Sequence, residues 1–380
     1  MLGIIIVLSV IFSVTGCTFF DYFKPKSEEN NIDVDESKDT LAILLKKDST
    51  YDNITLIELL NELLDSIQMD LGINNVGVLP VDFSSLDELD QFIEDLYYDE
   101  DVGYAIMIGR NLAWEGKEGW EDIKSDIQAA FHHINNELCF LESNEADNKG
   151  LPSSSFGVKD IAISWIMAPD FCNYDKTSEE INEMKIEIVN TIISNYIKYH
   201  NNPSEILGQY RQSCLYIYKQ DSLNTFYERD FNNGYQFEWT LVLNTQYDKV
   251  WEEFGNKHLI LYYAVHGTRT KLMINKSASD AFITVDDYAE FIGKNSLPSL
   301  FVNYGACEST VFQYDCNNVQ SGIYYCWPQL QLYHGAWAFY GSLPLDARAE
   351  LSTTSTFIGH VLRHYQTSTI VFGDITAHMV

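Results

Sequence analysis

Hydrophobic residues in the second half of the chain form runs without strict alternation, a pattern typical of strands covered on both faces of a parallel sheet. The clearest runs are His258–Val265 and Ser299–Tyr304. Between them, Thr284–Ile292 carries apolar residues at helical spacing, and Thr284 and Asp287 are spaced to form a capping box. A strand, a helix and a second strand in this order predict a βαβ unit with two parallel strands.

Helical and strand-like patterns alternate over most of the remaining chain. Helices are predicted for Thr55–Ile67, from Ser85 onward, for Trp120–Ile134 and for Ser178–Tyr199; strands are predicted for Val76–Phe83, Tyr104–Gly109, Asp160–Met167, Cys214–Tyr218 and Trp239–Leu243. This alternation predicts an α/β fold, a mostly parallel sheet with helices on both faces. The pattern is weakest over Asn135–Lys159, which we interpret either as a surface loop or as a boundary between two sheet-bearing halves.

The charge balance excludes some partners. The chain has 24 basic and 55 acidic residues and a net charge of −31, which argues against nucleic acid as a partner. Residues Glu28 to Asp101 contain 21 of the acidic residues and three lysines. We interpret this stretch as a solvated acidic surface, with a basic substrate or a structural calcium ion as the alternatives.

The N-terminus resembles the signal of a bacterial lipoprotein. The apolar run Leu2–Val14 is too short for an ordinary membrane span, and Gly16 precedes Cys17 as the small residue of such a signal does. The resemblance implies cleavage before Cys17, lipidation of its thiol and a protein anchored to the membrane outside the cytoplasm, in the bacterial cell envelope. No Lys or Arg precedes the apolar run, which leaves an upstream start or an uncleaved anchor as alternatives.

Two residues that can carry chemistry follow the two strands of the βαβ unit. His266 and Gly267 follow the first strand, and Cys307 follows the second. Parallel neighbours would bring His266 and Cys307 to the same sheet edge, where open α/β sheets bind ligands. An imidazole can activate a thiol as a nucleophile, and the backbone N–H groups of Gly267 and Cys307 could hold an oxyanion. The pattern favours a cysteine-nucleophile hydrolase.

This order of motifs resembles the caspase-like (clan CD) cysteine peptidases. A strand ending in His266-Gly267 precedes one ending in Ala306-Cys307, and the segments 104–110, 160–169, 335–341 and 372–374 resemble the gingipain-type family. The resemblance implies a caspase-like fold and a catalytic dyad of His266 and Cys307. It also implies a peptide or protein substrate and no required cofactor or catalytic metal.

The expected organisation has four parts. These are a lipoprotein signal at 1–17, an acidic tether at 18–40, an N-terminal α/β subdomain at 41–165 and a catalytic subdomain at 166–380. Thr268-Arg269, Thr310 and Ile375 depart from the family pattern. They leave a catalytically inactive surface lipoprotein that binds a ligand as the alternative function. A second His-Gly pair, His334-Gly335, precedes a predicted strand and is interpreted as a loop pair.

Overall fold

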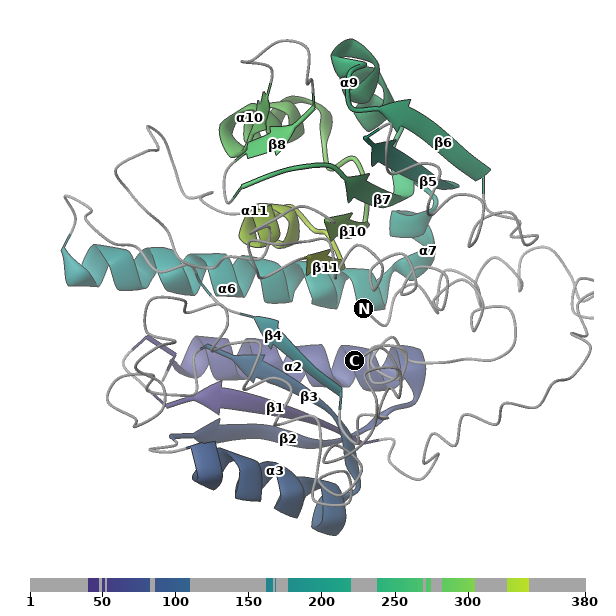
Figure 1. Cartoon of the computed structure of the whole chain (residues 1–380). Coiled ribbons are helices and arrows are strands. Elements are labelled where there is room, and N and C mark those ends of the chain that lie inside the picture. The colour runs from purple at the N-terminus through teal and green to yellow at the C-terminus, as the bar shows by residue number, and fades with distance from the viewer. Residues whose placement is uncertain are drawn as a thin grey trace, which may run out of the picture.

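Two parallel sheets with helices packed on them make up the fold (Figure 1). The structure is a computed structural model that describes residues 40–47, 50–51, 53–82, 86–109, 162–166, 168, 177–219, 238–268, 271–274, 282–304 and 327–341. We call the four-stranded sheet, with order β2-β1-β3-β4, the N-terminal sheet. The five-stranded sheet, with order β11-β10-β7-β5-β6, is the C-terminal sheet.

The N-terminal sheet is formed by β1 (Thr40–Lys46), β2 (Asn74–Val81), β3 (Val102–Ile108) and β4 (Ala162–Ile166). Its helices are α2 (Ile54–Leu71) and α3 (Leu86–Glu100). Residues of β1 alternate between the two faces, because side chains along a strand point to opposite sides. Leu41, Ile43 and Leu45 pack with α2, whereas Ala42 and Leu44 pack with α3. The sheet is therefore covered on both faces.

The C-terminal sheet is formed by β5 (Arg211–Tyr218), β6 (Glu238–Leu243), β7 (His258–Ala264), β10 (Phe301–Tyr304) and β11 (Ala338–Gly341). Its connections contain α9 (Tyr247–Gly255), α10 (Val285–Asn295) and α11 (Trp327–Tyr333). A short antiparallel pair, β8 (Lys271–Met273) and β9 (Phe282–Thr284), follows β7. The core on one face includes Leu261, Phe254 and Tyr288, all at most 1% exposed.

The long helix α6 (Ser178–Asn201) lies between the two sheets, followed by the short α7 (Pro203–Leu207) (Figure 1). One side of α6 joins the core of the N-terminal sheet through residues such as Ile188 and Ile192. In the carboxyl-terminal half of α6, the side-chain amide of Asn195 donates a hydrogen bond to the carbonyl oxygen of Tyr333 at 2.8 Å. The phenol of Tyr196 donates to the carbonyl oxygen of Trp337 at 2.7 Å. Helix α6 thus links the two halves.

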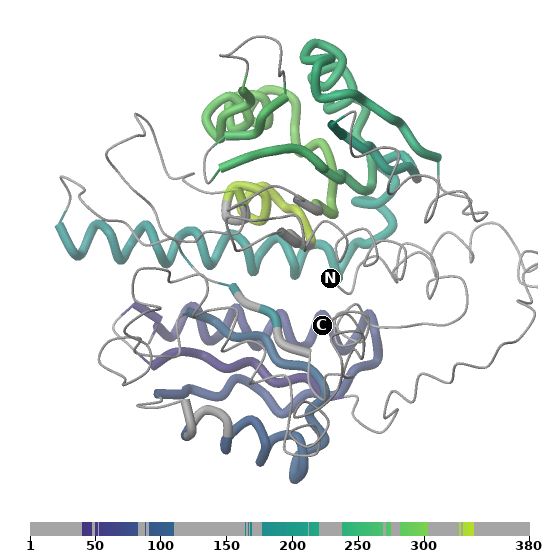
Figure 2. Tube along the Cα trace, viewed as in Figure 1, coloured from purple at the N-terminus to yellow at the C-terminus, as the bar shows by residue number. Residues whose placement is uncertain are grey.

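Most predicted elements are confirmed. The predicted capping box of Thr284 and Asp287 is present at the start of α10, and the predicted helix from Ser178 is α6. Strand β1 and helix α9 lie where the pattern predicted no element. The predicted helix Trp120–Ile134 lies outside the described residues. The chain completes the N-terminal sheet before it enters the C-terminal one (Figure 2).

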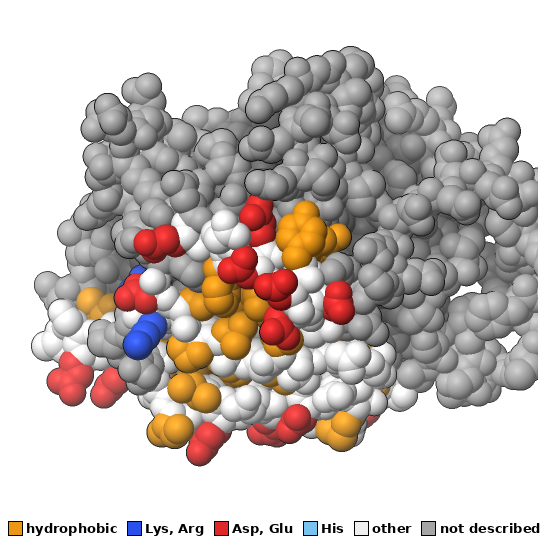
Figure 3. Space-filling model, turned by 90° about the horizontal axis from the view of Figure 1, so that it is seen from below, with side chains coloured by type: hydrophobic (Ala, Val, Ile, Leu, Met, Phe, Trp, Pro, Cys, Tyr) orange, Lys and Arg blue, Asp and Glu red, His pale blue; other side chains and the backbone are white. Residues whose placement is uncertain are grey.

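The face of the molecule that carries α3 is acidic (Figure 3). Exposed residues of this helix include the carboxylates Asp95, Asp99 and Glu100, and the ring of Tyr98 is also exposed. The exposure of these carboxylates is consistent with a solvated acidic surface.

None of the described helices is both long enough and apolar enough to cross a membrane. The predicted signal and Cys17 lie outside the described residues.

Candidate active site

The strand that precedes His266 and the strand that precedes Cys307 are neighbours. Strands β7 and β10 pair in parallel, with Ile260 opposite Phe301 and Tyr263 opposite Tyr304. Their carboxyl ends therefore lie at the same edge of the C-terminal sheet, as the sequence predicted. Cys307 itself and its backbone N–H group lie outside the described residues.

The strand order places this edge at a topological switch point. From β5 the chain moves outward to β6, then returns to the other side of β5 as β7 and continues through β10 to β11. Open parallel sheets bind their ligands outside the carboxyl ends of the strands where the order reverses. Here those strands are β5 and β7, whose ends are joined by a hydrogen bond of 3.1 Å from the Lys219 N–H group to the Ala264 carbonyl oxygen.

His266 stands in a short hairpin that follows β7. Its side chain is exposed, and its carbonyl oxygen accepts a hydrogen bond from the Met273 N–H group at 2.8 Å. The Thr268 N–H group donates to the Lys271 carbonyl oxygen at 2.8 Å. Gly267 lies opposite Leu272, between these two hydrogen bonds. In an antiparallel pair of this kind the N–H group of the middle residue points away from its partner strand. The Gly267 N–H group therefore points out of the hairpin.

The helix that leads from the hairpin to β10 is held in its first turn. Thr284 accepts a hydrogen bond from the Asp287 N–H group at 3.1 Å, and the Asp287 carboxylate accepts one from the Thr284 N–H group at 3.0 Å. Buried Tyr288 of α10 donates to the Gln331 side-chain oxygen of α11 at 3.2 Å. These contacts fix the crossover that sets β10 beside β7.

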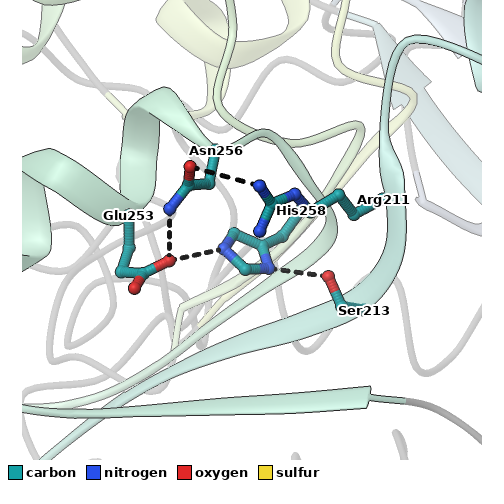
Figure 4. Close-up of polar contacts among 5 residues, drawn as sticks. All are labelled: Arg211, Ser213, Glu253, Asn256 and His258. Carbon is teal, nitrogen blue, oxygen red and sulfur yellow. Dashed lines mark hydrogen bonds and ion pairs between the residues drawn. The ribbon is translucent and has the colours of Figure 1, made fainter.

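A second polar constellation, which the sequence reasoning missed, lies at the opposite edge of the sheet (Figure 4). The Ser213 hydroxyl is 2.7 Å from Nδ1 of His258, and Nε2 of His258 is 3.2 Å from a carboxylate oxygen of Glu253. Because a carboxylate only accepts, Nε2 donates to Glu253 and Nδ1 accepts from Ser213. Asn256 donates to the same carboxylate oxygen at 2.8 Å and accepts from Arg211 at 3.5 Å.

This constellation has the donor and acceptor order of a serine hydrolase triad, but its position rules out that chemistry. Ser213 and His258 are each 1% exposed, and both stand near the amino ends of their strands. A buried hydroxyl cannot reach a substrate carbonyl. Burial lowers the pKa of His258, against the opposing effect of its hydrogen bond to Glu253. Burial raises the pKa of Glu253, but the hydrogen bonds from Asn256 and His258 outweigh it and lower the pKa overall.

Other candidate groups carry no site chemistry. His334 precedes β11, as expected of a loop residue, and burial lowers its pKa. Cys214 is fully buried, and burial raises the pKa of its thiol well above the ordinary value. Within the described ranges, no group of three or more His, Cys, Asp or Glu residues is placed to hold a metal ion. His132, His133 and Cys139 lie outside those ranges.

No protein-family model and no curated protein sequence matches the chain. Solved structures do resemble it. A structure described as a protease is 14% identical with a TM-score of 0.51, covering 82% of this chain and 60% of that one. The crystal structure of the arginine-specific cysteine proteinase gingipain R is 11% identical with a TM-score of 0.52, covering 91% of this chain and 72% of that one.

These likenesses define the class of fold. The chain has an α/β fold built from mostly parallel sheets with helices on both faces, as predicted. Within that class, it has the caspase-like fold of the gingipain-type cysteine peptidases. The chain spans about 60% of the length of the first of these structures.

Proposed function

We propose that this protein is a cysteine endopeptidase that hydrolyses peptide bonds through a dyad of His266 and Cys307. The observation that carries the proposal is the parallel register of β7 and β10, in which Tyr263 lies opposite Tyr304. His266 comes three residues after Tyr263 in the sequence, and Cys307 comes three residues after Tyr304. Equal offsets from a paired position on neighbouring parallel strands favour a meeting of the two side chains at the switch-point edge.

The chemistry of the two residues suits acyl transfer. In the proposed mechanism, the Cys307 thiolate attacks the carbonyl carbon of the scissile peptide bond, and His266 protonates the departing amine. Water, deprotonated by His266, then hydrolyses the thioester and releases the thiol. The outward N–H group of Gly267, together with that of Cys307, would hold the oxyanion. The exposure of His266 supports this mechanism, because a substrate needs access to it.

The proposal extends to location and partners. The lipoprotein-like segment around Cys17 supports a lipid-anchored protein outside the cytoplasm, with the subdomains at 41–165 and 166–380 beyond a tether at 18–40. The substrate would be a peptide or protein, and the net charge of −31 argues against nucleic acid. No cofactor takes part in the proposed mechanism.

Thiol labelling tests the dyad. We expect iodoacetamide near neutral pH to alkylate Cys307 much faster than Cys214, because an activated thiolate reacts faster than a buried thiol of raised pKa. The His266→Ala variant should lose the fast labelling. His334→Ala, which removes the histidine of the other His-Gly pair, is the matched control and should keep it.

Slow labelling of Cys307 that is the same in the wild type and in His266→Ala would overturn the dyad and favour a ligand-binding lipoprotein. The intact mass of each sample establishes whether the chain has been cleaved. Labelling is therefore compared both before and after any such cleavage, and the proposal fails only if both forms label slowly.

A further inference from the structure

The hairpin that carries His266 begins directly after β7 and returns as β8. His266 and Met273 face each other across the hairpin, where the Met273 N–H group donates to the His266 carbonyl oxygen at 2.8 Å. Leu272 and Ile274, on the returning strand, are fully buried in the core of the C-terminal sheet. The returning strand therefore helps to fix the position of the His266 backbone.

A buried side chain from the turn after β6 forms a hydrogen bond with this returning strand. Asn244 directly follows β6 and is only 4% exposed. Its backbone N–H group donates to the Tyr218 carbonyl oxygen at 2.9 Å, which ties it to the carboxyl end of β5. Its side-chain amide donates to the Met273 carbonyl oxygen at 3.3 Å. Met273 thus accepts from Asn244 and donates to His266.

We infer that Asn244 is a positioning residue that holds the His266 hairpin in place over the carboxyl ends of β5 and β7. The inference rests on the proposed function. The hydrogen bonds of Asn244 to Tyr218 and Met273 both end on backbone carbonyl oxygens, so its action on the reaction passes through Met273 to His266. A displacement of about 1 Å in a reacting group can cost about 100-fold in rate, so the loss of one such contact is measurable.

The side chain required at this position is a donor. Asparagine offers an amide N–H group to the Met273 carbonyl oxygen. Aspartate has nearly the same shape but, when ionised, only accepts hydrogen bonds, so it would face that carbonyl oxygen with a second acceptor. Asn244→Asp therefore removes the donor with little change in volume, and Asn244→Ala removes the whole amide.

A matched control is available in the same turn. The Gln246 side-chain oxygen accepts a hydrogen bond from the Leu243 N–H group at 3.0 Å, and the turn leads into α9. This bond stabilises the turn after β6 without contacting the hairpin. Gln246→Ala therefore reports what a purely structural loss at this place does.

The experiment measures kcat and KM on a fluorogenic peptide that the wild type cleaves, the pH profile of Cys307 alkylation, and the melting temperature of each folded variant. We expect Asn244→Asp and Asn244→Ala to lower kcat by about 10- to 100-fold with little change in KM. The alkylation profile should shift toward that of an ordinary thiol. Gln246→Ala should lower the melting temperature about as much as the Asn244 variants do. It should leave kcat and the alkylation profile unchanged.

The inference is overturned if the folded Asn244 variants keep the wild-type kcat and alkylation profile, or if Gln246→Ala reproduces their losses. Hydrogen exchange at the Met273 amide gives a readout that does not depend on activity, and it should be faster in both Asn244 variants. If the wild type neither cleaves peptides nor alkylates rapidly at Cys307, the proposed function fails first. The positioning role then falls with it.

Discussion

Tyr263 of β7 lies opposite Tyr304 of β10 in a parallel ladder. This pairing puts the two strands that precede His266 and Cys307 side by side, with their carboxyl ends at one edge. We therefore expect His266 and Cys307, which are 41 positions apart in the sequence, to lie in the same region.

The first prediction concerns His266. Replacing it with glutamine should lower kcat by about 10²- to 10⁴-fold, because the change removes the proposed proton-transfer group. The fold should persist, since the His266 side chain is exposed. The measurement is the rate of hydrolysis of a fluorogenic peptide, with a melting curve for the same sample. Full activity in this variant would contradict the proposed role of His266.

The second prediction concerns the capping box of α10. Thr284→Ala should lower the free energy of unfolding by about 1 kcal/mol, because the side-chain acceptor for the Asp287 N–H group is lost. Urea denaturation measures this change. Lys294→Ala, which removes an exposed ion pair with Glu290 on the same helix, should cost less than about 0.5 kcal/mol. Equal losses in the two variants would count against the cap.

The third prediction concerns pH. In the folded protein the pKa of His258 is lowered below its ordinary value of 6.5. The unfolded chain therefore binds more protons than the folded protein in the range just below 6.5. The contribution of His258 to stability is fully present above pH 6.5. It is lost as the pH falls from there through the lowered pKa. His258→Gln should reduce this dependence.

Urea denaturation of both proteins at about pH 7.5 and about pH 5.5 gives the two slopes to be compared. The pKa of buried His200 is also lowered by burial, so part of the dependence should remain in the variant. Identical dependence in the wild type and in His258→Gln would show that His258 does not contribute.

The fourth prediction concerns Gly109, which follows β3. Its φ angle is +80°, and a Cβ atom there would lie 2.6 Å from the ring of Tyr51. Gly109→Ala should destabilise the protein by about 1–3 kcal/mol through backbone strain and this clash. Gly293→Ala is the matched control, since a Cβ atom there meets nothing within 4 Å.

Gly293 is exposed and lies inside α10, so alanine at that position should stabilise the helix by up to about 1 kcal/mol. Chemical denaturation of both variants measures the two effects, which should have opposite signs. A neutral Gly109→Ala variant would show that Tyr51 and the local backbone can move without cost.

The sequence alone was enough to predict much of the local structure and the class of fold. Thr284 and Asp287 predicted the start of α10, and the continuous apolar runs predicted buried parallel strands, because both signals depend on residues close together in the chain. The motif order around His266 and Cys307 predicted the caspase-like fold that the structural comparisons support. The roles of those two residues remain predictions.

Tertiary structure decided the contacts between distant segments. In the sequence, Asn244 has the pattern of an ordinary turn residue. Only the folded structure shows that its side chain donates to the Met273 carbonyl oxygen in the hairpin. Ser213 lies 45 positions before His258, and no local spacing signals that the two meet. A local pattern can specify a helix cap or a buried strand, but long-range partners depend on how the strands are ordered in the sheet. That order is set by the packing of the whole core.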